Sequence, residues 1–383
     1  MFGSLNAHRG LVYVTAGNLV GAMITGGFWL LLATIQSPEE YGNTNYGIAI
    51  SSLASSIVLV GLNTVSTKYL AKGSARIHIE ANQVIFICSA IAAAIVGILY
   101  NWISGLFVIG MAYWMMSLYE ALGKKLYKQY ALINIGSRFL QFVLSLVLFF
   151  TLGLEGVVIG FTISFFLFSY RYFGTIRRFN FRQFSEVKGL VKFASHSYSL
   201  NMSNAFFMYF DKLIIVPFFG AAVLGLYQIG FQFLMFLGMI PISFYQYLLP
   251  EQSSGSAKTK VHIYGFLVAV ILAVLLFALS PWILENIFPN FSDSTDVVRI
   301  MSTGIVPMML SGTLNSKFVA SNHTKNVVVG SVIYLTVQVS LMFTLVQTLG
   351  SVGVAIATVC ALISQASFLV VSSRLMPKTL LAS

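Results

Sequence analysis

Long uncharged apolar stretches recur along the whole chain, and this pattern constrains the fold more than any other feature. The 383 residues are 57% hydrophobic and only 9% charged, whereas about a quarter of the residues in a soluble domain are charged. A helix needs about 20 largely apolar residues to cross a bilayer. Such stretches lie at 11–35, 44–66, 82–102, 104–121, 131–151, 154–173, 193–217, 222–249, 263–286, 297–320, 327–348 and 351–373. The sequence therefore predicts an all-α polytopic membrane protein with about twelve transmembrane helices.

The basic residues predict how these spans are oriented. The chain has 22 Lys and Arg against 11 Asp and Glu, which gives a net charge of +11. All the Lys and Arg except Arg138, Lys212 and Arg299 fall in alternate connections, and such residues collect on the cytoplasmic side of a membrane. We therefore expect a multi-pass protein of the cell membrane with both termini in the cytoplasm. Because topology accounts for the positive charge, we expect no nucleic-acid partner.

The two halves of the chain resemble each other at equivalent turns. Residues 152–159 read LGLEGVVI and residues 349–356 read LGSVGVAI. A weaker match sets Tyr41-Gly42 beside Leu224-Gly225. Since six spans is an even number, both halves would have the same orientation, related by a pseudo-two-fold axis along the membrane normal.

This repeat predicts how the chain is divided. We expect an N-terminal six-helix bundle at 1–175, a basic cytoplasmic linker at 176–192 and a C-terminal six-helix bundle at 193–383. Two such bundles are an architecture for alternating access. Cys88 and Cys360 lie far apart in apolar runs, and the five His are scattered. We therefore expect no metal, no cofactor and no enzymatic activity.

Ionisable residues inside spans are costly and are functional candidates by default. Three lie clearly inside spans, Arg138, Asp211 and Lys212, and mostly polar residues share a helical face with two of them. These are Asn134, Gln141 and Ser145 around Arg138, and Ser197, Asn201, Asn204 and Met208 before Asp211. We expect both faces to line a substrate cavity, where a guanidinium suits phosphate or carboxylate. The alternative for Arg138 and Lys212 is that they extend to the lipid headgroups.

Asp211 and Lys212 are adjacent in the sequence. Because neighbouring side chains do not face each other on a helix, we expect no ion pair between them. For Asp211 the choice is between a helix–helix hydrogen bond and a coupling or gating site. Asn18 and Asn63 either line the same cavity or join helices by hydrogen bonds.

Basic residues also gather where the first and second cytoplasmic loops are expected, between spans two and three and between spans four and five. Among them, Lys68, Lys72, Lys124 and Lys125 are candidates for docking a lipid phosphate. The alternative, general attraction to anionic headgroups, requires no specific substrate.

Several short motifs resemble those of polysaccharide exporters. Residues 37–42, SPEEYG, look like the Pro-Glu-Glu-aromatic-Gly turn of that family. The run FDKLII at 210–215, followed by LGLY at 224–227, is similar to its Asp-x-x-Ile pattern leading into Gly-Leu-Tyr. Gly61-Leu62 and the turn GLEG at 153–156 fit as well. In this order the motifs resemble the Wzx-type O-antigen and polysaccharide flippases, whose superfamily also holds lipid II flippases and multidrug and toxin extrusion transporters.

The resemblance implies a V-shaped, two-lobed core of twelve helices. Such a flippase moves a polyprenyl-pyrophosphate-linked oligosaccharide or polysaccharide repeat unit from the inner to the outer leaflet. Membrane lipids and glycan-biosynthesis enzymes would be its partners, and we expect a monomer. The alternative is a cation-coupled multidrug or metabolite exporter of the same fold. Coupling to a sodium or proton gradient through Asp211 stays open.

Overall fold

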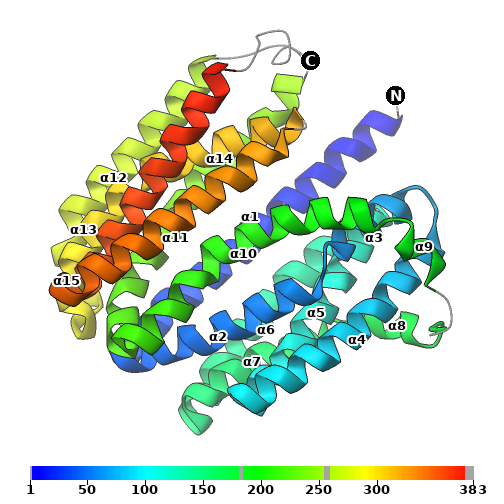
Figure 1. The fold of residues 1–383 in the computed structure, drawn as a ribbon, viewed down its shortest axis with the longest axis horizontal. Coiled ribbons are helices and arrows are strands. Elements are labelled where there is room, and N and C mark those ends of the chain that lie inside the picture. The colour runs from blue at the N-terminus through cyan, green and yellow to red at the C-terminus, as the bar shows by residue number, and fades with distance from the viewer. Residues whose placement is uncertain (1, 181–183, 254–258, 322, 376–383) are drawn as a thin grey trace. The chain divides into compact units, whose positions relative to one another are not determined.

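The computed structural model describes residues 2–180, 184–253, 259–321 and 323–375. In this part of the chain every regular element is a helix, and short turns join most of them (Figure 1). The order is α1 (Phe2–Ile35), α2 (Pro38–Val58), α3 (Leu62–Ala71), α4 (Ala75–Leu99), α5 (Trp102–Gly123), α6 (Tyr127–Leu152), α7 (Leu154–Leu167), α8 (Tyr170–Ile176), α9 (Ser185–Lys188), α10 (Val191–Phe219), α11 (Ala221–Ser253), α12 (Thr259–Ile287), the 3₁₀ helix η1 (Pro289–Ser294), α13 (Thr295–Thr303), α14 (Ile305–Ala320) and α15 (Thr324–Leu375).

The described helices are long and apolar enough for a polytopic membrane protein. Nine of them qualify as spans by length and composition, and two bent pairs raise the number to eleven if each pair is one span. α15 has 52 residues and is interrupted at Gly350, so each of its two parts is long enough to cross a bilayer. The predicted all-α membrane fold is confirmed, and counting α15 as two spans gives the expected twelve.

Two predicted spans are bent by more than 40° between two helices. The stretch at 44–66 bends by 50° between α2 and α3, where Val60 and Gly61 have φ of 46° and 73°. A Cβ on Gly61 would lie 2.2 Å from the carbonyl oxygen of Ala194, so glycine is required there. The stretch at 154–173 bends by 57° between α7 and α8. Average hydropathy over a long window does not register a bend that involves only a few residues.

The turns that resemble each other in sequence also share their backbone geometry. Gly153, between α6 and α7, has φ 64° and ψ −141°, and Gly350, within α15, has φ 55° and ψ −133°. Three residues later, a Cβ on Gly156 or Gly353 would lie 2.1 or 2.6 Å from a main-chain oxygen before the turn. The sequence repeat is therefore also a structural repeat. Its first glycine sets the turn, and its second allows close backbone contact.

Contacts between residues group the chain into two compact units. They are unit 1, residues 1–28 and 46–210, and unit 2, residues 29–45 and 211–383. The three boundaries between the units fall within α1, α2 and α10, so each of these helices contributes to both units. The predicted division into bundles at 1–175 and 193–383 stays a prediction. Residues 181–183 of the expected linker at 176–192 lie outside the described residues.

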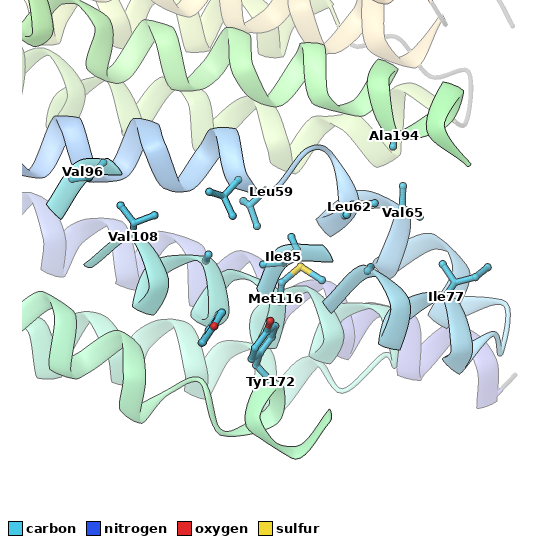
Figure 2. Close-up of a cluster of buried hydrophobic side chains, with 14 residues drawn as sticks. Leu59, Leu62, Val65, Ile77, Ile85, Val96, Val108, Met116, Tyr172 and Ala194 are labelled. Carbon is cyan, nitrogen blue, oxygen red and sulfur yellow. The ribbon is translucent and has the colours of Figure 1, made fainter. Parts of the chain in front are cut away.

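Unit 1 has an apolar core to which several helices contribute (Figure 2). Val65 of α3, Ile85 of α4 and Met116 of α5 are fully buried in it. Tyr172 of α8 stacks on Tyr113 of α5 with ring centroids 4.0 Å apart. Helices inside a bilayer associate through this kind of close packing, because lipid tails are as apolar as the side chains. The core fixes α5, which carries two of the polar residues discussed below.

In unit 2 the beginnings of α2 and α11 pack closely together. Tyr41 is fully buried and its ring contacts those of Trp29 and Phe291, with centroids 5.9 and 5.5 Å away. A Cβ on Gly42 would lie 1.9 Å from a main-chain oxygen of α11, and one on Gly225 would lie 1.7 Å from a main-chain oxygen of α2. The weaker sequence match thus marks two glycines that allow these helix ends to touch.

Candidate functional site

Part of the polar face predicted on α6 forms hydrogen bonds to neighbouring helices. Asn134 is buried and donates hydrogen bonds to a main-chain oxygen of α1 at 3.2 Å and to Oδ1 of Asn18 at 3.1 Å. Ser145 is fully buried and donates to a main-chain oxygen of α7 at 3.0 Å. Asn134 and Ser145 thus join α6 to its neighbours, whereas Arg138 and Gln141 hydrogen-bond to each other.

Arg138 is half-buried, with its guanidinium held against an amide and an aromatic ring. Its Nη1 donates to Oε1 of Gln141, one turn along α6, at 3.2 Å. Its Cζ lies 4.9 Å from the ring centroid of Trp114 on α5, which is cation–π distance. Among the described residues, no carboxylate lies within ion-pair distance of Arg138.

The asparagines predicted for the cavity divide into two groups. Nδ2 of Asn201 on α10 donates to Oδ1 of the buried Asn63 on α3 at 3.2 Å. Asn18 is exposed and accepts from the hydroxyl of Tyr130 at 2.9 Å. Asn204 is exposed as well. Hydrogen bonds between helices, the second of the two roles considered from the sequence, thus occupy Asn18, Asn63 and Asn201.

Asp211 and Lys212 form an ion pair, so the expectation that they would not pair is wrong. Both are buried, and Nζ of Lys212 lies 3.1 Å from Oδ1 of Asp211. The periodicity argument follows the direction of the Cα–Cβ bonds, whereas the four-carbon stem of lysine is long enough to fold back by one residue. Nζ also lies 4.3 Å from the ring centroid of Phe231. Lys212 is thus held within unit 2 and does not extend to the headgroups.

The Asp211 carboxylate is the start of a buried hydrogen-bond network in unit 2. The hydroxyl of Tyr227 donates to its Oδ2 at 2.8 Å. That hydroxyl is also 3.2 Å from Oγ1 of Thr358, which accepts from Nε2 of Gln338 at 3.1 Å. The network joins α10, α11 and α15. A helix–helix hydrogen bond, one of the two roles considered for Asp211, is therefore present.

The lysines predicted to dock lipid phosphate are all exposed. They are Lys68, Lys72, Lys124 and Lys125. Nζ of Lys72 lies 5.7 Å from the ring centroid of Tyr69, and Lys124 forms an ion pair with Glu120. Lys125 follows α5 with φ of 59°. Their exposure is compatible with both roles considered from the sequence.

A buried charged cluster around Glu120 escaped the sequence analysis. Glu120 of α5 is only 3% exposed and accepts from Nη2 of Arg171 at 3.1 Å. Nε2 of His78, also buried, lies 3.6 Å from its Oε2, and Nδ1 of His78 is hydrogen-bonded to Ser66. From the sequence, His78 is only one of five scattered histidines. One sequence signal could have indicated this cluster. Glu120 is an acidic residue directly before a connection that is otherwise basic and begins with Lys124.

A second buried glutamate, Glu80 of α4, holds the short helix α9. Its Oε2 accepts hydrogen bonds from the backbone N–H groups of Glu186 and Val187 at 2.9 and 3.2 Å. Its Oε1 lies 3.3 Å from Nε of Arg76, and Nη1 of the same arginine lies 3.8 Å from Oε1 of Glu186. A side chain 106 residues away thus caps α9 and anchors the described part of the basic linker to unit 1. No three His, Cys, Asp or Glu side chains are placed to hold a metal within the residues that the structure covers.

Solved structures identify the class of this fold. A multidrug resistance MATE family transporter of the MOP superfamily in an inward-facing conformation matches with a TM-score of 0.67 and 16% identity, over 94% of this chain and 95% of that chain. The lipid II flippase MurJ in an inward closed conformation matches with a TM-score of 0.68 and 15% identity, over 97% and 89%. No protein-family model and no curated protein matches the sequence.

A third matched structure is a transporter that is described by the polarity of its binding pocket. It is a MOP superfamily transporter from Pyrococcus furiosus, whose binding pocket is described as having reverse polarity that suggests a different function. The TM-score is 0.57 at 15% identity, over 97% of this chain and 96% of that chain. The chain therefore has the fold of the MOP-superfamily transporters. These matched proteins are transporters and not enzymes.

Proposed function

We propose that the protein is a Wzx-type flippase, which moves a polyprenyl-pyrophosphate-linked oligosaccharide or polysaccharide repeat unit from the inner to the outer leaflet by alternating access. The observation that carries this proposal is Arg138. It is a half-buried cation within the span formed by α6, and none of the described carboxylates lies within ion-pair distance of it.

The position of Arg138 favours an anionic substrate. Placing an arginine at the centre of a transmembrane helix costs about 2.5 to 3.5 kcal/mol by insertion measurements. In unit 1 this cost is offset by an amide, Gln141, and by the ring of Trp114, neither of which carries a negative charge. A pyrophosphate would supply that charge, and a guanidinium can bind two of its oxygens through parallel N–H groups.

The exposed lysines support the same substrate class. Each basic side chain near an anionic membrane surface contributes about 1 kcal/mol of attraction. We propose that Lys68, Lys72 and Lys125 draw a lipid-linked phosphate toward unit 1 from the inner leaflet. Lys124 would contribute less because it already pairs with Glu120.

The alternative, a cation-coupled exporter of drugs or metabolites, fits unit 2 less well. A site for a cationic substrate or a coupling ion requires a carboxylate that is accessible to the cation. Lys212 and Tyr227 already bind both oxygens of the Asp211 carboxylate.

We further propose the setting in which this flippase acts. The charge alternation favours the cell membrane, with both termini in the cytoplasm. The Wzx-type resemblance adds glycan-biosynthesis enzymes as the source of the substrate, and a monomer without a bound cofactor or metal as the working form.

The test is translocation of a fluorescent polyprenyl-pyrophosphate oligosaccharide in proteoliposomes. Arg138→Ala should reduce the rate about tenfold or more, because a hydrogen-bonded charge contact with the substrate is lost. Arg138→Lys should retain part of the rate, since a point charge remains without the planar fork. The matched control is Arg299→Ala, because Arg299 also lies over an aromatic ring, Phe277, but has a carboxylate partner in Asp296.

Two results would contradict the proposal. One is an equal rate in wild type and Arg138→Ala. The other is the absence of lipid movement together with efflux of cationic dyes driven by an ion gradient, which would identify the exporter instead.

A further inference from the structure

Two buried hydrogen-bond donors beside Arg138 have no partner. Nε1 of Trp114 and Nε2 of Gln141 are both buried without a hydrogen bond, and each side chain is only 2% exposed. An unsatisfied buried donor costs about 1 to 3 kcal/mol, so most such groups in proteins have partners. Two of them at one place therefore need an explanation.

Geometry places both donors next to the guanidinium. Oε1 of Gln141 accepts from Nη1 of Arg138, and Nε2 is bonded to the same amide carbon as that oxygen. The guanidinium lies over the indole ring that contains Nε1 of Trp114. An arginine has no acceptor atom, and neither does an indole N–H, so these groups cannot satisfy one another. The cluster presents donors from three side chains and a positive charge, and the missing component is an anion with several acceptor oxygens.

The cluster is also held in position before any ligand arrives. The ring of Trp114 packs against that of Phe165 with centroids 5.1 Å apart. Gln141 lies one turn from Arg138 on the same helix, and the hydrogen bond between them orients its amide. All three side chains belong to unit 1. Donors that are fixed in advance bind an anion without losing further side-chain freedom.

We propose that Trp114, Arg138 and Gln141 form a phosphoryl-binding subsite that holds one phosphate group of the transported pyrophosphate. The subsite rests on the proposed function and adds to it two residues that no motif marks. Arg138 supplies the charge and up to two parallel donors, and the indole and amide N–H groups reach the remaining oxygens. A carboxylate has only two oxygens, both in one plane, so it presents fewer acceptor directions to donors from three side chains than a phosphate does.

The experiment measures binding to the purified full-length protein by titration calorimetry. The probes are undecaprenyl pyrophosphate, inorganic pyrophosphate and undecaprenol, which has the chain without phosphate. Trp114→Phe keeps an aromatic ring beneath the guanidinium and removes the N–H donor together with the five-membered ring of the indole. Gln141→Met keeps the length of the side chain and removes the amide. Each should weaken binding of undecaprenyl pyrophosphate about tenfold, as expected for one hydrogen bond to a charged group. The control is Trp29→Phe, which replaces another buried tryptophan, in unit 2.

The two probes that contain phosphate separate the sources of the anion. Binding of undecaprenyl pyrophosphate that depends on Trp114, with none of undecaprenol, would support the subsite. If inorganic pyrophosphate shows the same dependence while the lipid is neither bound nor transported, the subsite stands as a site for free anions and the flippase is wrong.

Other results would overturn the subsite alone. If Trp114→Phe and Gln141→Met bind the lipid as tightly as wild type does, and wild type transports it, the flippase stands and the subsite is wrong. Gln141→Glu provides a further check, because its carboxylate would pair with Arg138 and exclude a phosphate. Unchanged binding by that variant would also overturn the subsite.

Discussion

Asp211 and Lys212 are neighbours in sequence on one helix, and their side chains form a buried ion pair with 3.1 Å between Oδ1 and Nζ. Two separated charges at these positions would each lose several kcal/mol of solvation. Pairing offsets part of that loss, and Tyr227 satisfies the second carboxylate oxygen. Electrostatics therefore selects a side-chain arrangement that helix periodicity alone would not suggest.

Removing one partner of this pair should cost more than removing both. Asp211→Asn leaves the Lys212 ammonium buried without its counter-charge, which should lower the free energy of unfolding by about 3 to 5 kcal/mol. The double variant Asp211→Asn with Lys212→Met removes both charges and should recover most of that loss. Thermal unfolding in detergent of the two single variants and the double variant measures the coupling. Additive effects would mean that the two side chains do not interact.

Glu80 should control how firmly the described part of the linker is held. Glu80→Ala leaves the backbone N–H groups of Glu186 and Val187 without their acceptor, so α9 should detach from α4 more often. Trypsin should then cut several-fold faster at the exposed Arg177 and Arg178, because cleavage follows local opening. Limited proteolysis of protein in detergent measures the rate.

The control for that experiment removes a weaker contact in the same place. Glu186→Ala breaks only the 3.8 Å ion pair with Arg76, in which both side chains are about half exposed. Such pairs contribute roughly 0 to 1 kcal/mol, so the cleavage rate should change little. If the two variants are cut equally fast, the Glu80 carboxylate does not anchor α9.

Gly225 should tolerate no side chain. In Gly225→Ala the new Cβ would lie 1.7 Å from a main-chain oxygen of α2, so the two helix ends must move apart. Overpacking of this kind costs about 1 to 3 kcal/mol, which a fall in the unfolding temperature would report. Gly312→Ala is the control, because its Cβ meets nothing within 4 Å. Equal stability of the two variants would disprove the close contact.

Gly153 and Gly350 should respond alike to substitution. Their backbone angles lie in a region that L-residues rarely adopt, and alanine there should cost about 1 to 3 kcal/mol. Neither Cβ would touch a neighbour within 4 Å, so the expected loss comes from the backbone alone. Gly174→Ala, which has open space and no such strain, is the control for thermal unfolding. A large difference between the two turns would contradict their structural equivalence.

Hydropathy, charge placement and the internal repeat were enough to predict the fold class. Each of these patterns reports how a whole segment partitions between lipid and water, and that partition dominates the energetics of a membrane chain. The repeat at Gly153 and Gly350 was visible because special backbone angles restrict the residue type. The bend near Gly61 was not recognised, although its glycine is the same kind of signal.

The polar clusters were harder to predict because they depend on long-range distances. Arg138 and Asp211 are conspicuous in apolar segments, yet their partners Trp114 and Tyr227 are ordinary residues of hydrophobic helices. Glu120 meets Arg171 across 51 residues of chain, and no local pattern links the two. A sequence can reveal which charge needs a partner, but helix packing decides which side chain provides it.

The guanidinium above Trp114 also gives this protein an intrinsic optical reporter. The chain has four tryptophans, and the other three are Trp29, Trp102 and Trp282. Trp102 and Trp282 are 67% and 60% exposed, so phenylalanine should replace them with little disturbance. With Trp29 also replaced, Trp114 would be the sole indole fluorophore. Its emission would then follow changes around Arg138 in real time, without a chemical label.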